Sequence, residues 1–263
     1  MAINKDSNAY TISFAIILVV LVGGLLAFVS TSLKPMQLSN VKNEKKQNIL
    51  NSLPGINFER SEAEGNFNKY VKKRVILDYT GNVVDGSVKT STDDIKDKDT
   101  LDAFNIDLQK EYRNIAVEAR NYPLFECEID GKTFYVLPVT GKGLWDAIWG
   151  YISVESDGES IAGAVFDHKA ETPGLGAEIN KDEFEDQFDA LKIGRIKSNS
   201  ELSAANFRSI KVVKPGSLSD KLTQVDGISG GTFTSVGVQE MLKRTFYVYY
   251  KHFNENKLET ANL

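Results

Sequence analysis

An uncharged apolar segment near the amino terminus constrains the architecture more than any other feature of this chain. Residues Ile12 to Val29 contain no charged side chain and are nearly all apolar, and about 20 such residues span a bilayer. A cleaved signal peptide is the alternative, but its apolar core rarely exceeds about 15 residues and its start is more basic than Lys5 beside Asp6. The sequence therefore predicts one uncleaved membrane helix over residues 10–31, after a short tail of residues 1–9.

No second apolar segment is long enough to return across the membrane, so the remaining residues are expected on one side. The charge pattern near the apolar segment bears on which side that is. Only Lys5 and the amino terminus precede the segment, whereas four lysines follow it: Lys34, Lys42, Lys45 and Lys46. Taken alone, the positive-inside rule places the following domain in the cytoplasm.

The composition excludes several classes of function. A hydrophobic content of 41% and a charged content of 25% are ordinary for a globular protein. A net charge of -5 without a long basic run argues against nucleic acid as a partner. Cys127 is the single cysteine, so one chain forms no disulfide and no cysteine-based metal centre. The acidic residues of 155–159 and 182–189 suit a turn and a solvated helix face rather than a calcium loop, and no metal site is predicted.

Alternating apolar residues separated by turn residues predict two consecutive β-hairpins. Residues 125–129 and 133–137 flank Asp130-Gly131, and residues 151–154 and 161–166 flank Ser156-Asp157-Gly158. Consecutive hairpins form an antiparallel sheet. The predicted fold class is α+β: an antiparallel sheet built from hairpins with packed helices, carried by one N-terminal membrane helix.

Helical spacing of apolar residues predicts the other elements. Residues 32–60 form a stalk, with a helix over 42–53 that ends at Pro54-Gly55. Residues 61–263 form the main domain, with an exposed charged loop over 85–100. Further strands are expected at 74–79 and 210–214, partial helix at 101–114, and helices at 181–191 and 236–250.

The stretch from Asp226 to Ser235 contains three glycines and four hydroxyl residues directly before the last predicted helix. Glycine allows close backbone approach to a ligand, and a helix start presents unpaired N–H groups that suit phosphate. This pattern points to a phosphate-bearing cofactor. A capped helix without any ligand fits the same composition.

Two enzyme classes fit the chain poorly. Gly227-Ile-Ser-Gly-Gly231 has the letters of a nucleophile elbow, with Ser229 as nucleophile and His168 as base. That elbow must follow a strand of an α/β sheet, whereas residues 222–225 are a weak strand among antiparallel hairpins. A Gly-x-Gly-x-x-Gly sequence in a βαβ unit is absent, which excludes a dinucleotide fold.

Residues Asp226 to Thr232 resemble the recognition sequence of bacterial flavin transferases: Asp, two residues, Ser or Thr, Gly, Ala, Thr. The resemblance implies that FMN is esterified through its phosphate to Thr232. It also implies that the transferase recognises four preceding residues, namely Asp226, Ser229, Gly230 and Gly231. Gly231 stands where alanine is usual, which replaces one small residue by another.

A second motif agrees with the first. Residues Glu171 to Gly176 resemble the Glu-Thr-Pro-Gly-Leu-Gly signature of the FMN-binding domain family. With the N-terminal anchor, both motifs make essentially the whole chain similar to the C subunits of sodium-translocating NADH:quinone reductases. The G subunits of Rnf complexes share the flavin motif and are the alternative. The long segment between the anchor and the first hairpin favours the C subunits.

The resemblance implies a function as an electron-carrying flavoprotein subunit without an NADH site of its own. The expected partners are the other subunits of the reductase, and a flavin transferase during maturation. The expected location is the bacterial inner membrane, single-pass, with the domain periplasmic, which opposes the lysine count. The expected cofactor-binding residues besides Thr232 are Trp145, Glu171, Thr172, Gly174, Leu175 and Gly176. A membrane-anchored scaffold without cofactor is the alternative from a different class.

Overall fold

The computed structural model describes residues 7–195, 203 and 206–261, which divide into two compact units of residues 1–45 and 46–263. Helix α1 (Asn8–Asn51) contains the predicted membrane segment, and its apolar window has no buried share. It is the one helix among the described residues that is long and apolar enough to cross a membrane. Pro35 lies within α1, and the helix predicted at 42–53 forms its last part.

A six-stranded antiparallel sheet organises the second unit, in the order β2-β1-β3-β4-β5-β6. The strands are β1 (Val71–Leu77), β2 (Lys89–Thr90), β3 (Tyr122–Ile129), β4 (Lys132–Lys142), β5 (Ala147–Glu155) and β6 (Ile161–His168). Asp130 and Gly131 both have positive φ, 49° and 77°, which is the backbone of the tight hairpin turn that their sequence predicts. The α+β class and the hairpin-built sheet are therefore confirmed.

Short elements and one long helix surround the sheet. They are α2 (Arg60–Tyr70), η1 (Ala103–Asn105), α3 (Leu108–Asn114), η2 (Val117–Ala119), η3 (Gly176–Asn180), α4 (Asp182–Glu185), η4 (Asp186–Phe188), β7 (Gly194–Arg195), β8 (Phe207–Arg208), β9 (Lys211–Val213), β10 (Gln224–Asp226) and α5 (Thr232–Ala261). The helix predicted over 181–191 is confirmed only in part, because the chain forms α4 and then the 3-10 turn η4 and ends both by Phe188. Its aromatic spacing is real, because Phe184 and Phe188 both contact Phe166, but the chain turns at Ala190, where φ is 60°.

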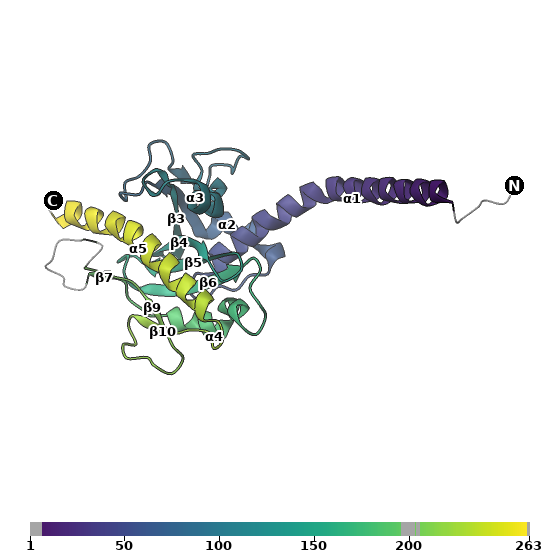
Figure 1. Cartoon of the computed structure of the whole chain (residues 1–263). Helices are drawn as coiled ribbons and strands as arrows, with labels where there is room; N and C mark the ends of the chain where they lie inside the picture. The colour runs from purple at the N-terminus through teal and green to yellow at the C-terminus, as the bar shows by residue number, and fades with distance from the viewer. Residues whose placement is uncertain (1–6, 196–202, 204–205, 262–263) are drawn as a thin grey trace. The chain divides into compact units, whose positions relative to one another are not determined.

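Helix α5 lies across one face of the sheet (Figure 1) and packs mainly on β4. It begins at Thr232, four residues earlier than predicted, because the hydroxyl-rich stretch itself enters the helix. The predicted apolar stripe is buried against the sheet: Val238, Leu242 and Tyr249 are 0% exposed. A second core on the opposite face joins Ile49 and Leu50 to Phe67 and Phe125.

The sheet register brings the end of β4, the start of β5 and the end of β6 to one corner of the sheet. Lys142 at the end of β4 pairs with Ala147 at the start of β5, so residues 143–146 form a tight connection. Ile148 pairs with His168 at the end of β6, which brings residues 169–176 beside that connection. Gly237 of α5 approaches the carbonyl oxygen of Lys142 so closely that a Cβ there would clash with it. The first turn of α5 therefore lies at the same corner.

A half-buried carboxyl on α4, that of Glu185, makes the stability of this unit depend on pH. Burial raises the pKa of Glu185 to about 7, although its carboxylate accepts the Phe166 N–H at 2.5 Å. The folded state thus holds this proton more tightly than the unfolded chain, whose glutamate has a pKa near 4.5. The contribution of protonated Glu185 to the free energy of unfolding is fully present below pH 4.5 and is lost as the pH rises through 7.

The substitution Glu185→Gln is expected to remove this loss of stability at high pH. We expect it to raise the free energy of unfolding at pH 8 by about 1–3 kcal/mol while changing it little at pH 4.5. Urea unfolding of the protein in detergent, followed by near-ultraviolet circular dichroism at both pH values, measures the difference. An equal pH dependence in the variant and the parent would contradict the assignment.

Candidate functional site

The loop before α5 presents Thr232 as the first residue of the helix. Gly230 has φ of 75°, and the Gly231 N–H donates to the Ile228 carbonyl at 3.0 Å, which closes a tight turn. The Ser235 hydroxyl accepts the Ile228 N–H at 2.9 Å and thus fastens the loop to the first turn of the helix. Gly231 is buried, and Thr232 is exposed at the helix start. The first position of α5 is therefore open to solvent.

Two further hydroxyl residues of the same stretch differ from Thr232. Thr234 is 1% exposed, and its hydroxyl donates to Oε2 of Glu171 at 2.5 Å. Ser229 is exposed, but it lies in the loop before the helix rather than on it. Thr232 is therefore the hydroxyl that combines solvent access with the helix N-terminus, where the dipole favours a bound anion.

A buried carboxylate, Glu171, connects the three segments of this corner. It is 4% exposed and accepts the Trp145 N–H at 2.9 Å as well as the Thr234 hydroxyl. Its own N–H donates to Nδ1 of His168 at 3.2 Å. Burial opposes the charged form, but the bonds from Thr234 and from the N–H groups of residues 144–146 outweigh it and lower the pKa of Glu171. The ionised carboxylate thus holds residues 144–146 and the first turn of α5 together.

Two glycines leave the space that this carboxylate occupies. A Cβ on Gly143 would lie 2.5 Å from Oε1 of Glu171, and one on Gly176 would lie 2.5 Å from Oε2 and would clash with the Thr234 hydroxyl. Glycine is therefore required at both positions for steric reasons. Gly174 is different, because its φ of 76° requires glycine although nothing lies within 4 Å of its Cβ position.

The substitution Gly176→Ala is expected to break the Glu171–Thr234 hydrogen bond. A buried carboxylate that loses a donor costs about 1–3 kcal/mol, and we expect that loss in the free energy of unfolding. We also expect a lower yield of flavin-bearing protein, because the start of α5 shifts. Urea unfolding and the absorbance of bound flavin measure the two effects. Gly65→Ala is the control, because that helical glycine has open space around its Cβ position.

A surface ion cluster fixes the connection between β4 and β5. Asp146 binds the Arg113 guanidinium, the Lys169 ammonium at 2.9 Å and the Ala147 N–H at 2.8 Å. The hydrogen bond from Lys169, and then that from Arg113, lower the pKa of Asp146. Its carbonyl accepts the Gly143 N–H at 2.8 Å. The connection that carries Trp145 is thus held at both ends.

Large apolar side chains lie exposed around Thr232, an arrangement unusual for a soluble surface. Trp145 is 65% exposed, with its indole N–H donating to the Thr172 hydroxyl at 3.2 Å. Leu175 lies against Gly230, where a Cβ would approach its Cδ2 to 2.7 Å. We call these residues, with two others that the sequence analysis missed, the apolar rim: Leu144, Trp145, Leu175 and Phe233. An isolated apolar residue resembles a core residue in sequence, which is why Leu144 and Phe233 gave no signal.

The predicted site residues therefore gather at one corner of the domain. Trp145, Thr172 and Leu175 lie at the surface, whereas Glu171 and Gly176 lie beneath it. Asp226 ends β10, and its carboxylate accepts the Gly216 N–H at 2.9 Å. A Cβ on Gly231 would lie 3.0 Å from Ile228, so this loop favours glycine where the transferase sequence has alanine.

These residues fit a bound FMN. The helix N-terminus offers N–H groups to a phosphate, glycines permit close approach, and the apolar rim offers contacts for a flat ring system. Among the described residues, no group of three or more histidine, cysteine or carboxylate side chains is arranged to hold a metal ion. The arrangement is suited to holding a phosphorylated redox cofactor.

Comparison with known proteins finds an FMN-binding domain in this part of the chain. A family model described as an FMN-binding domain matches residues 143–246. The C subunit of the Na(+)-translocating NADH-quinone reductase from Vibrio anguillarum is 30% identical over 240 residues, covering 91% of this chain and 90% of its own. The corresponding subunit from Neisseria meningitidis serogroup B is 28% identical over 264 residues, covering 98% and 97%.

Two solved structures share the fold. The crystal structure of the Na(+)-translocating NADH-quinone reductase C subunit from Parabacteroides distasonis is 38% identical, with a TM-score of 0.68, and covers 84% of this chain and 96% of its own. That of Shewanella oneidensis NqrC is 26% identical, with a TM-score of 0.60, and covers 82% and 98%.

Proposed function

Since the chain belongs to the family of C subunits of the Na(+)-translocating NADH-quinone reductases, we propose that it carries FMN bound covalently through its phosphate to Thr232. Family and domain make it a flavin-carrying subunit of that oxidoreductase complex. The covalent bond, its position and the residues around the cofactor are the parts that we propose. When bound, FMN supplies reversible electron transfer at its ring system.

The exposed hydroxyl of Thr232 at the start of α5 carries this proposal. In the attachment step, Oγ1 of Thr232 would give up its proton to solvent and bond to the phosphorus of an activated FMN, whose leaving group would depart as that bond forms. A transferase that recognises Asp226, Ser229, Gly230 and Gly231 would catalyse this step. The resulting phosphodiester charge lies at the positive end of the helix dipole.

The remaining site residues position the cofactor and its surroundings. Glu171 holds the connection of Trp145 against the first turn of α5 through its two hydrogen bonds. Leu175 and Trp145 offer apolar contact to the ring, and Thr172 orients the indole. A covalent bond keeps FMN in place while electrons pass between neighbouring subunits, and the chain needs no NADH site of its own.

Intact mass spectrometry of protein purified from its own host tests the proposal. We expect one population heavier than the polypeptide by one FMN less one water, and a fluorescent band after denaturing electrophoresis. Protein expressed without a flavin transferase is expected to lack both. An unmodified polypeptide from the native host would overturn covalent attachment and favour either dissociable FMN or a scaffold role.

We also propose that the domain is periplasmic, with α1 as its anchor in the bacterial inner membrane and the other reductase subunits as partners. The apolar helix supports anchoring, and the family resemblance supports the orientation against the lysine count. The domain boundaries proposed are residues 32–60 for the stalk and 61–263 for the flavin domain. Cleavage of the domain by protease added outside intact spheroplasts is expected, and protection there would reverse the orientation.

A further inference from the structure

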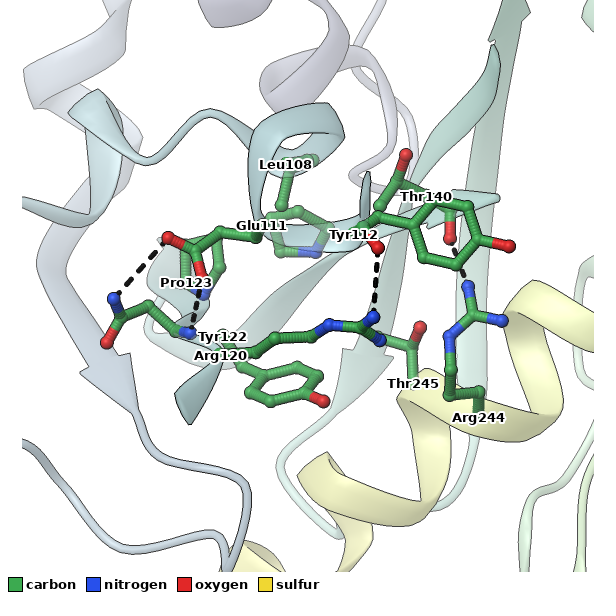
Figure 2. A pocket seen from close by; sticks show the side chains of 11 residues that line it. Leu108, Glu111, Tyr112, Arg120, Tyr122, Pro123, Thr140, Arg244 and Thr245 are labelled. Carbon is green, nitrogen blue, oxygen red and sulfur yellow. Dashed lines mark hydrogen bonds between the residues drawn. The ribbon is translucent and has the colours of Figure 1, made fainter. Parts of the chain in front are cut away.

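Two arginines and a tyrosine converge on a small cavity far from the flavin corner (Figure 2). Arg244 comes from α5, while Arg120 and Tyr122 come from the entry to β3. At about 1.5 Å per residue, Arg244 lies about 18 Å along the helix from Thr232. The cavity measures about 30 Å³, and an adjoining groove of about 450 Å³ shares Tyr122 and Arg244 with it.

The two guanidinium groups approach the same aromatic ring without an ion-pair partner. Arg244 lies 4.4 Å from the ring centroid of Tyr112 and Arg120 lies 5.4 Å from it. Arg244 donates to the Thr140 carbonyl at 2.6 Å, and Arg120 to the Tyr112 carbonyl at 2.9 Å (Figure 2). Arg120 also donates to the Ile115 carbonyl at 3.0 Å. Within the described part of the chain, no carboxylate forms a salt bridge with either arginine. Burial and the charge of Arg120 both lower the pKa of Arg244. The carboxylate of Glu111 also lines the cavity, but it accepts the Asn121 N–H at 2.9 Å and forms no salt bridge with either arginine in the described part of the chain.

The Tyr122 hydroxyl adds a buried donor that lacks an acceptor. Tyr122 is 7% exposed, and its hydroxyl has no hydrogen-bond partner among the described residues. The charged groups that act on it are the guanidinium groups of Arg120 and Arg244, which only donate, and the carboxylate of Glu111, which accepts from Asn121. A buried donor normally has a partner, and leaving it without one is unfavourable. The cavity therefore presents three donor groups, and the Tyr122 hydroxyl among them has no acceptor within the described part of the chain.

The adjoining groove suits a flat apolar group attached to that acceptor. Its volume lies within the range of about 300–1,000 Å³ that is typical of ligand sites. Aromatic and aliphatic side chains line it, among them Tyr79, Phe207, Tyr247 and Val248. Its charged lining is mixed, with two glutamates, Glu118 and Glu240, beside Lys243, Arg244 and Lys251. Its remote end is basic, because the Lys251 ammonium lies 4.7 Å from the Tyr247 ring centroid and donates to the Tyr79 carbonyl.

We propose that this groove binds a carboxylate carried on a flat apolar body. The carboxylate oxygens accept hydrogen bonds from Arg244 and the Tyr122 hydroxyl, and the body lies against Tyr247 and Phe207. A free organic acid and an acidic side chain of a neighbouring subunit beside an apolar one both present this chemistry. The proposal is independent of the flavin, because none of these residues belongs to the flavin corner.

Titration of 2-naphthoate into the full-length flavin-bearing chain in detergent, measured by calorimetry, tests the site. A charge-assisted hydrogen bond changes affinity by about tenfold or more, so naphthoate is expected to bind at least about tenfold more tightly than neutral 2-naphthamide. Arg244→Gln is expected to weaken naphthoate binding about tenfold. Tyr122→Phe removes only the unpartnered hydroxyl, so the variant should fold, and we expect about fivefold weaker binding.

The controls separate this site from general charge and from the flavin. Lys211→Gln removes an exposed positive charge on β9 and should change affinity less than about twofold. The covalent flavin content should be equal in all variants. Equal binding of naphthoate and naphthamide, unchanged binding by Tyr122→Phe, or no binding to the chain would overturn the proposal and leave a water-filled cavity.

The assembled reductase complex identifies the source of the carboxylate. If 2-naphthoate binds to the isolated subunit but not to the complex, a neighbouring subunit already occupies the groove. If 2-naphthoate binds to both, the groove is a site for a free organic acid. Either result supports the carboxylate site.

Discussion

Replacing Thr232 by alanine is expected to abolish covalent flavin completely while leaving the fold intact. Thr232 is exposed at the first position of α5, and the turn before it is held by Gly231 and Ser235 rather than by its own side chain. Loss of the hydroxyl removes the atom that forms the ester bond, so we expect no residual covalent flavin. Intact mass and fluorescence after denaturing electrophoresis measure the outcome, and near-ultraviolet circular dichroism verifies the fold.

Neighbouring hydroxyl residues provide the matched controls. Thr232→Ser retains an exposed hydroxyl at the helix start and should retain part of the flavin. Thr234→Val should retain the hydroxyl of Thr232 but lose the bond to Glu171, so we expect a less stable protein that still carries an adduct. A persistent full adduct on Thr232→Ala would move the attachment site to Ser229 or Thr234. Absence of an adduct from the parent as well would contradict covalent attachment itself.

Local patterns predicted the sheet and the last helix because their determinants are close in sequence. Asp130-Gly131 specifies a hairpin by its backbone preference alone, and the spacing of Val238, Leu242 and Tyr249 specifies the buried face of α5. The helix expected at 181–191 was predicted less well. Its aromatic spacing is helical, but Phe184 and Phe188 pack on Phe166 of β6, a contact between distant residues that local spacing does not show.

The site was predicted by motif rather than by geometry. The two flavin motifs indicate Glu171 and Thr232, yet the bond that joins their segments runs from Thr234 to Glu171, 63 residues apart. No spacing rule connects such positions. Trp145 could equally have been a core residue, and its 65% exposure follows only from the connection that Asp146 and Glu171 hold in place.

A buried ion pair beside the sheet was also not predicted from the sequence. Breaking it is the second change for which we expect a large effect, here on the free energy of unfolding. Arg74 of β1 is 0% exposed and Asp102 is 1% exposed, with Nε and Nη2 each 3.0 Å from a carboxylate oxygen. Arg74 also donates to the carbonyls of Thr90 and Asp93, in a loop whose charges the sequence indicated to be solvated. The pair thus fastens residues 89–102 to the sheet.

The substitution Asp102→Ala is expected to lower the free energy of unfolding by about 3–5 kcal/mol, because it leaves the Arg74 guanidinium buried without its counter-charge. It also removes the acceptor of the Phe104 N–H at 2.9 Å. Urea unfolding of the full-length protein in detergent, with the slope compared between variants, measures the change.

The adjacent residue of β1 supplies the control for this prediction. Lys73 pairs with Glu126 at 3.0 Å, but their side chains are 48% and 26% exposed. Glu126→Ala should therefore change the free energy of unfolding by about 0–1 kcal/mol. The double substitution Arg74→Met with Asp102→Leu should recover much of the loss, since an apolar pair needs no counter-charge. Equal effects of Asp102→Ala and Glu126→Ala would show that burial does not determine the strength of these pairs.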